Sequence, residues 1–276
     1  MASNVSTPLL EPSVSQTLPP PSPSPLGAQP APSSSADLDG IPPLSLDVLT
    51  TRDEKVDAFK LVADSVAQQR QKASLNLVFH PLLLAGLVSA LSWAWHHGWV
   101  KRHGDLGFTM IFVSGIIMTY LMGIRYLSSP YIKVAEDLRW DWLVAEDGEE
   151  DTIIGSKFGD EMIGALVLRL EPNPSLANKK KNRALSLKGG KGVIRAWTTK
   201  LRYRKRGVGS DLLHEAVRVT REKCGKDAQV GFAQEHANST MVLPDFFNGP
   251  FRKQEMQAAR ALEKVLGEWE GNRRKR

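Results

Sequence analysis

The chain has 276 residues, of which 42% are hydrophobic and 24% charged, which leaves room for one or two globular domains. Its single cysteine, Cys224, excludes an intramolecular disulfide framework and suits a domain in the reducing cytosol. The formal net charge is +6, and basic residues gather in 179–191 and 273–276. Such runs are typical of a surface that faces anionic lipid or nucleic acid, and equally of a solvated charge run.

The first 43 residues are dominated by proline, serine and small residues and carry almost no charge. Such a segment cannot bury a core, so we expect residues 1–43 to be disordered. A basic stretch followed by an apolar run is missing here, so we expect no secretory signal.

Residues 44–74 read as the first part of a globular domain. Alternating apolar residues predict a strand over 44–49. Thr51 and Glu54 form a capping box, and the apolar stripe behind them predicts a helix to about Lys72.

Two long runs, 75–100 and 106–124, contain no Asp, Glu, Lys or Arg. About 20 apolar residues cross a bilayer, so the sequence predicts a membrane-spanning helical hairpin within residues 75–132. The alternative is a pair of buried core helices. Only residues 101–105 separate the runs, so the hairpin must be tight and return the chain to the side it left.

Basic residues predict the orientation of this hairpin. More of them flank it than lie in its turn, which contains Lys101 and Arg102. The flanking set is Lys60, Arg70, Lys72, Arg125, Lys133 and Arg139. By the positive-inside rule both ends lie in the cytoplasm. We therefore expect an integral membrane protein of the endoplasmic reticulum or another endomembrane, with its remaining domain in the cytosol. The histidines near the runs are interpreted as interfacial side chains, not as metal ligands.

Downstream of the hairpin the pattern alternates between strands and helices. A short helix is expected over 131–142, and an acidic loop follows at 146–151. Strands are predicted over 152–158, 162–170, 193–201 and 228–233, the first two joined at Gly159 and Asp160. A basic loop covers 178–192. Helices are predicted from Val208 to a C-cap at Gly225 and over 254–269.

The turn between the strand at 193–201 and the next helix carries the strongest functional signal. Gly207 and Gly209 remove the side chains that would keep a ligand from the backbone, and a helix N-terminus attracts phosphate. Arg204, Lys205 and Arg206 add cationic donors beside them. A plain tight turn is the alternative. The ending of a P-loop and the third glycine of a dinucleotide fingerprint are both missing.

The spacing Arg204-x-x-Gly207-x-Gly209, between a strand and an amphipathic helix, resembles the acetyl-CoA pyrophosphate loop of the GNAT superfamily of N-acetyltransferases. The order of predicted elements over 44–266 is similar to that of a GNAT domain with the apolar hairpin inserted. The resemblance implies an α/β (α+β) fold, a mixed central sheet with flanking helices, interrupted by a transmembrane hairpin. Residues 133–267 would be the remainder of the domain and 268–276 a basic tail. Such an insertion is similar to that of the membrane-anchored camello-type members.

The resemblance also implies a cofactor, acetyl-CoA, and residues that would hold it. Its pyrophosphate would lie on the loop formed by Arg204, Lys205, Arg206, Gly207, Val208, Gly209 and Ser210. Backbone N–H groups at Trp197 and Thr199 would stabilise the oxyanion of the tetrahedral intermediate, and Asn238 would contact the cofactor. Many members use a tyrosine after that asparagine as general acid, but here Phe246 and Phe247 stand in the expected region.

Glu235 and His236 have the chemistry and position to serve as the base, although a structural or solvent-facing role is the favoured interpretation of each. Cys224 is expected to pack in the core.

The leading interpretation is a membrane-anchored acetyltransferase acting on a primary amine of a small molecule or a protein. The basic loop at 179–191 favours an acceptor that bears a carboxylate or phosphate over a polycation, and the alternative is that this loop rests on anionic lipid headgroups. The alternatives are a non-catalytic acyl-CoA-binding or scaffold protein and, last, a membrane-tethered nucleic-acid binder, which has no interleaved aromatic residues in its favour.

Overall fold

The computed structural model describes residues 42–101, 105–145, 148–173 and 187–274. Most of the expected disordered segment and most of the basic loop therefore lie outside the described residues. The chain divides into Met1–Ile41 and Pro42–Arg276, and the fold below is that of the second unit.

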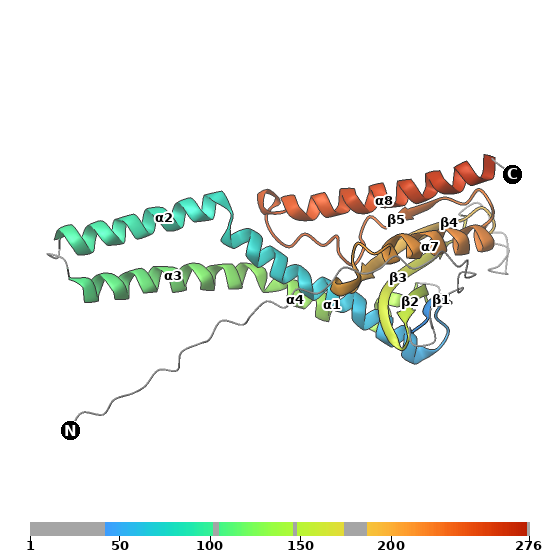
Figure 1. Ribbon diagram of the computed structural model, residues 1–276, viewed down its shortest axis with the longest axis horizontal. Helices are drawn as coiled ribbons and strands as arrows, with labels where there is room; N and C mark the ends of the chain where they lie inside the picture. The colour runs from blue at the N-terminus through green and yellow to red at the C-terminus, as the bar shows by residue number, and fades with distance from the viewer. Residues whose placement is uncertain (1–41, 102–104, 146–147, 174–186, 275–276) are drawn as a thin grey trace, which may run out of the picture. The chain divides into compact units, whose positions relative to one another are not determined.

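A five-stranded mixed sheet forms the centre of this unit (Figure 1). Its strands are β1 (Leu44–Val48), β2 (Thr152–Phe158), β3 (Glu161–Glu171), β4 (Lys191–Thr199) and β5 (Val230–Phe232), in that spatial order. The pairs from β1 to β4 are antiparallel, whereas β4 and β5 are parallel. Gly159, with φ +61°, makes the predicted turn between β2 and β3. All five predicted strands are present, each within two or three residues of its expected bounds.

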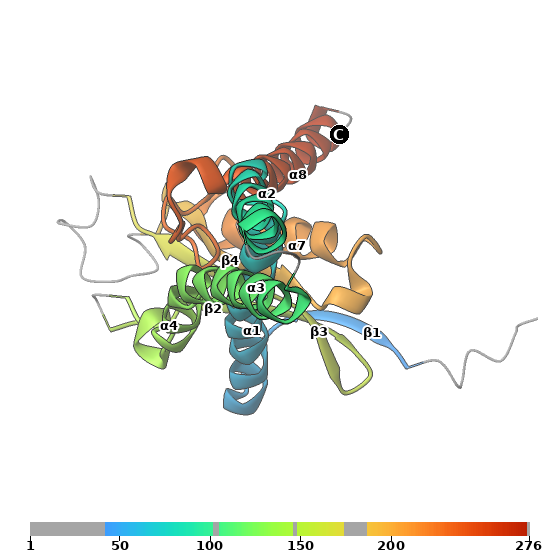
Figure 2. The ribbon, with the colours of Figure 1, turned by 90° about the vertical axis from the view of Figure 1, so that its left-hand side faces the viewer.

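Helices cover both faces of the sheet (Figures 1 and 2). Helices α1 (Arg52–Val78) and α4 (Pro130–Glu136) pack on one face, where Phe59, Val62 and Val167 are buried together. Helices α7 (Val208–Cys224) and α8 (Gly249–Arg274) pack on the other, around Ile194, Leu212 and Val265. The expected mixed sheet with flanking helices is confirmed.

A bulge in β4 changes the direction of the strand. Val167 of β3 pairs with Ala196 and Leu168 pairs with Ile194, so Arg195 is an extra residue without a partner on β3. As a result Ile194 packs on the α7 face while Ala196 packs on the α1 face, although the two are only two residues apart. Without the extra residue, both would lie on one face.

Beyond the bulge β4 has an open edge. The last strand pair between β4 and β5 is Ile194 with Phe232, whereas β4 continues to Thr199. The Lys200 N–H donates to Ile163 O on β3 at 2.8 Å. Backbone groups alternate between the two edges of a strand, so those of Thr199 and Trp197 point to the edge that β5 leaves open.

The bulged residue is held by a buried carboxylate. Asp151, at the start of β2, accepts from Arg195 Nη1 at 2.7 Å and from Arg169 Nε at 2.7 Å. The Arg195 guanidinium also lies 3.9 Å from the ring centroid of Trp142, a cation–π contact. This cluster ties three strands together at the bulge.

The apolar hairpin is formed by α2 (Pro81–His96), the π-helical turn η2 (His97–Lys101) and α3 (Leu106–Ser128). Its two helices run side by side away from the sheet (Figure 1). Large apolar side chains on them are exposed, including Leu82, Val88, Trp93, Trp95, Met110, Ile111, Met118 and Met122. The run Leu106–Glu136 is the one described helix that is long and apolar enough to cross a membrane by itself.

The first apolar run, 75–100, is not the single helix that the sequence suggested. Helix α1 continues to Val78, and the helix after it is bent by 52° relative to α1. Pro81 explains the break, because it has no N–H and disfavours helical backbone at the residue before it, where His80 has ψ 129°. Helices α1 and α2 are long and apolar enough to cross a membrane only if the bent pair counts as one span.

A cluster at the root of the hairpin joins it to the sheet domain. The cluster contains Ala73, Leu77, Ile124, Tyr131, Leu243, Phe247 and Phe251. Ser74 Oγ donates to Ser128 Oγ at 2.9 Å, and Tyr120 donates its hydroxyl to Val78 O at 2.8 Å. The ends of α1 and α3 are therefore held against each other.

Two further helix predictions need correction. Thr51 is the N-cap of α1, but its hydroxyl donates to Glu54 Oε2 and does not accept a backbone N–H as a capping box requires. Residues 131–142 form α4 and the separate 3₁₀ turn η3 (Trp140–Leu143). Trp140 and Trp142 both pack against Phe59, and in one helix they would point about 200° apart.

Helix α8 is longer than predicted. It starts at Gly249 and continues to Arg274, so residues 268–274, expected in a basic tail, are its last turns.

We expect Asp151→Ala to lower the free energy of unfolding by about 3 kcal/mol, because two arginines would lose their common carboxylate. Urea denaturation of the detergent-solubilised protein measures this. The control is Lys60→Ala, which removes an exposed ion pair with Asp57 and should cost at most about 0.5 kcal/mol. Equal costs for the two variants would contradict a structural role for Asp151.

Candidate active site

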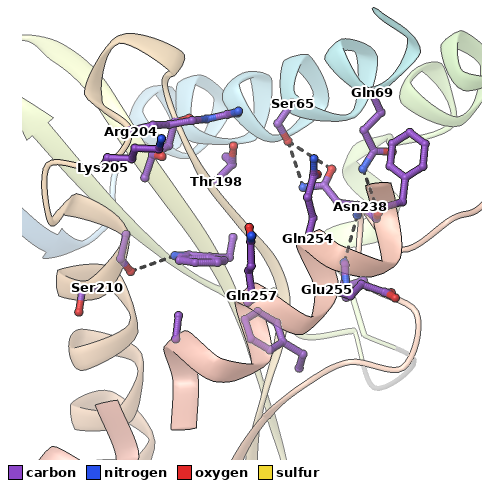
Figure 3. Close-up of a pocket in the computed structure, with 18 of the residues that line it drawn as sticks. Ser65, Gln69, Thr198, Arg204, Lys205, Ser210, Asn238, Gln254, Glu255 and Gln257 are labelled. Carbon is purple, nitrogen blue, oxygen red and sulfur yellow. Dashed lines mark hydrogen bonds and ion pairs between the residues drawn. The ribbon is translucent and has the colours of Figure 1, made fainter. Parts of the chain in front are cut away.

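A cavity of about 610 Å³ lies between α1, the open edge of β4, the first turn of α7 and α8 (Figure 3). Its wall combines residues that are far apart in the sequence. The lining residues include Ser65, Gln69, Lys72, Trp197, Thr199, Arg204, Lys205, Gly207, Gly209, Ser210, His236, Asn238, Phe251, Gln254 and Glu255.

The two glycines of the predicted phosphate loop have different structural roles. Gly207 is the N-cap of α7 and has φ +94°, a backbone conformation that side chains disfavour. Gly209 has a close neighbour instead, because a Cβ there would lie 2.9 Å from Trp197 Cζ2. Trp197 also donates its indole N–H to Gly209 O at 3.0 Å. The loop therefore packs directly against β4 at Trp197, and the first turn of α7 lines the cavity.

Positive charge accumulates in the cavity. Burial lowers the pKa of the Arg204 guanidinium, and burial together with the Arg204 charge lowers the pKa of Lys72. Arg204 Nε donates to Thr199 O at 3.1 Å. In the part of the chain that the structure describes, no carboxylate lies within 4 Å of the Lys72 or Arg204 side-chain nitrogens. These two cations are therefore available to an anionic ligand.

The segment after β5 is pinned to α1 by Asn238. The Asn238 side-chain amide lies 3.4 Å from Ser65 Oγ, and the Asn238 backbone carbonyl accepts from Gln69 Nε2 at 2.9 Å. The Asn238 backbone N–H donates to His236 Nδ1 at 3.2 Å. These bonds place the predicted residues Asn238 and His236 together on the cavity wall.

His236 faces a carboxylate that sequence reasoning missed. Its Nε2 lies 3.8 Å from Glu255 Oε1, on the second turn of α8. Burial lowers the pKa of His236, although the Glu255 charge opposes this, so the imidazole is neutral near pH 7. Because Nδ1 accepts a backbone N–H, the neutral ring carries its proton on Nε2, towards Glu255. Glu255 is then the group in this pair that can accept a proton from a ligand.

The other candidate acid and base groups lie elsewhere. Glu235 is exposed and does not line the cavity. No tyrosine lines it among the described residues: Tyr203 donates to Glu161 Oε2 at 3.0 Å, and Tyr131 is buried at the hairpin root. Phe247 is buried against His80, with ring centroids 4.6 Å apart. Cys224 is buried in the core, where burial raises the pKa of its thiol.

Nine of the twelve predicted site residues line the cavity, whereas Arg206, Val208 and Glu235 do not. Gln69, Lys72 and Glu255 were missed. The spacing of Ser65, Gln69 and Lys72 is a signal that could have identified part of the α1 side, because it places three polar residues on one helix face. Ser65 and Gln69 are buried there.

Among the described residues, no group of three or more His, Cys, Asp or Glu side chains is arranged to hold a metal ion.

Comparison with known proteins gives one family. Residues 119–240 match the profile of the acetyltransferase (GNAT) family. The match begins within α3 and ends just after Asn238, so it includes β2 to β5 and the predicted phosphate loop. No curated protein and no solved structure matches the chain. The mixed sheet with flanking helices is consistent with the GNAT fold, and the match supports a GNAT acetyltransferase domain in this chain, with the acyl-CoA-dependent acetyl transfer that this family performs in general.

Proposed function

We propose that this protein is a membrane-anchored N-acetyltransferase that moves an acetyl group from acetyl-CoA to a primary amine. One observation carries the proposal. The open edge of β4 and the N-terminus of α7 line the same cavity as the carboxylate of Glu255. Donor binding, oxyanion stabilisation and proton removal are thereby provided in one place.

The donor would lie across the phosphate loop. Its pyrophosphate fits the first turn of α7, where Gly207, Gly209 and Ser210 leave the backbone accessible. Arg204, Lys205 and Lys72 would supply positive charge, and the partial burial of Arg204 and Lys72 strengthens their interaction with phosphate because the local dielectric is low. The pantetheine arm would follow the open edge of β4.

The transfer step needs hydrogen-bond donors for the carbonyl oxygen and acceptors for the two protons that an ammonium nitrogen loses on becoming an amide. The amine nitrogen attacks the thioester carbon, and the negative charge that develops on the carbonyl oxygen is stabilised by backbone N–H groups at Trp197 and Thr199. The C–S bond then breaks and CoA leaves as a thiolate. Glu255 would take the first ammonium proton before the attack, directly or through water. The attacking nitrogen would lose its second proton to solvent as the intermediate collapses, and the thiolate would take a proton from solvent.

The apolar hairpin would be the anchor. Helix α3 has the length and composition to span a bilayer, and the exposed apolar side chains of α2 and α3 would face lipid. Basic residues outside the hairpin favour a sheet domain on the cytosolic side of an endomembrane. This insertion supports the likeness to the camello-type members.

A second candidate function is favoured by one specific observation. No tyrosine lines the cavity within the described ranges, so the usual general acid of the family has no counterpart there. A protein that binds acyl-CoA without transferring the acetyl group would have the same phosphate loop. Turnover measurements distinguish the two functions.

We expect Gly209→Val to weaken acetyl-CoA binding at least tenfold, because the new side chain meets the Trp197 ring and displaces the first turn of α7. Isothermal titration calorimetry on the solubilised full chain measures the affinity. The control is Gly267→Ala on α8, where an added Cβ meets nothing within 4 Å. Unchanged affinity in Gly209→Val would remove the loop from the donor site.

We expect Glu255→Gln to lower kcat by about 10²-fold or more, since a general base is lost, while acetyl-CoA affinity stays within about twofold. CoA thiol release with ethylamine as acceptor measures turnover. Glu235→Gln is the matched comparison, because its carboxylate is exposed outside the cavity. A loss of kcat confined to Glu235→Gln would instead assign the base to Glu235. If neither the wild type nor the variants release CoA, the non-catalytic function is favoured.

We expect both flanks of the hairpin to be cytosolic. Protease treatment of sealed endomembrane vesicles with the cytosolic face outward should digest a tag placed after Arg276 and protect a tag inserted at His103. Protection of the C-terminal tag, or extraction of the protein by alkaline carbonate, contradicts the anchored topology.

A further inference from the structure

The cavity extends to the root of the hairpin. Phe251 lines the cavity and also belongs to the root cluster, where its ring stacks on Tyr131 with centroids 5.8 Å apart. Lys72 Nζ lies 3.5 Å from Gln254 Oε1, so α1 and α8 meet at this end of the cavity. This end of the cavity therefore lies beside the first residues of the apolar hairpin.

Exposed apolar side chains continue from this end along α1. Leu75 is 54% exposed and Phe79 is 69% exposed, and both follow Lys72 at helical spacing on the same face. Leu82, 66% exposed, lies in the first turn of α2 just past the bend, and Phe246, 62% exposed, lies beside His80. We call Leu75, Phe79, Leu82 and Phe246 the apolar strip.

The strip leads from the cavity towards the part of the hairpin that would face lipid. Seven residues of helix separate Lys72 from Phe79, a rise of about 10 Å. A group of large exposed apolar side chains close together is typical of a ligand or membrane contact and not of a water-facing surface. The strip begins beside the cavity and ends beside the helices that would face lipid, and this position indicates the kind of ligand that would bind there.

We propose that the acceptor is a single-chain amphiphile, a primary amine whose alkyl chain lies on the apolar strip and continues into the bilayer. This inference rests on the acetyltransferase function proposed above. The amino group would reach Glu255 and His236 past Phe251, while the chain stays out of water.

The charges in the cavity agree with a monoamine. Lys72 and Arg204 repel a polycation, and a nearby positive charge favours the neutral form of an amine, which is the nucleophile. The sequence alone favoured an anionic acceptor through the basic loop at 179–191, most of which lies outside the described residues. The described cavity and the strip together favour the amphiphile.

A chain-length series tests the proposal. The full-length protein in a fixed concentration of detergent is supplied with acetyl-CoA and with ethylamine, butylamine, octylamine or dodecylamine, and the release of CoA thiol is followed. Each methylene that becomes buried on the strip should raise kcat/KM about threefold to fourfold. Octylamine should therefore exceed ethylamine by at least about 100-fold.

A matched pair of variants separates the strip from simple partitioning of the amine into detergent. In Leu75→Gln/Phe79→Gln the ratio of kcat/KM for octylamine to that for ethylamine should fall at least tenfold. The control is Tyr126→Gln on α3. Tyr126 is 78% exposed at a similar level of the hairpin, as the Ser74–Ser128 bond shows, but it lies off the strip. Its ratio should equal that of the wild type.

The outcomes are distinct. Equal kcat/KM for ethylamine and octylamine in the wild type would overturn the amphiphile proposal and leave the acetyltransferase function in place. The same fall in both sets of variants would also overturn it, because the chain would then act only through the detergent. Absence of CoA release with every amine would overturn the acetyltransferase function and this inference with it.

Discussion

One extra residue in β4 determines how the site is built. The bulge at Arg195 moves Ala196 to the α1 face and turns the backbone of Trp197 and Thr199 towards an edge that β5 does not cover. Asp151 holds the bulged residue from the start of β2. The cavity, the contact between Trp197 and Gly209, and the placement of α7 all follow from the direction that β4 takes after this point.

Features encoded in short stretches of sequence could be predicted. Alternating apolar residues gave the strands, and Gly207 and Gly209 marked the turn before α7, because backbone conformation and close approach restrict those positions to glycine. Most of the loop residues and Asn238 do line the cavity. Gln69, Lys72 and Glu255 could not be assigned, because they reach the cavity only through the packing of α1 and α8 against a remote part of the chain.

Composition was also a poor guide to where one helix ends and the next begins. The run 75–100 is uniformly apolar, yet Leu77 is buried at the hairpin root while Leu75 and Phe79 are exposed. That division depends on Tyr131, Phe247 and Phe251, which approach from later segments. Likewise, Trp140 and Trp142 leave the helical pattern because both rings pack against Phe59. Tertiary contacts override the local preference in both places.

Helix α1 is continuous from the cavity to the hairpin. It contributes Ser65, Gln69 and Lys72 to the cavity wall and Ala73 and Leu77 to the root. From Gln69 to Val78 the helix rises about 14 Å, so the cavity is held at a fixed height above the first apolar turn. If the hairpin is embedded as proposed, the catalyst works within one thin layer beside the membrane surface. Encounters there occur by lateral diffusion in two dimensions, and a molecule in the bulk cytosol must first enter that layer.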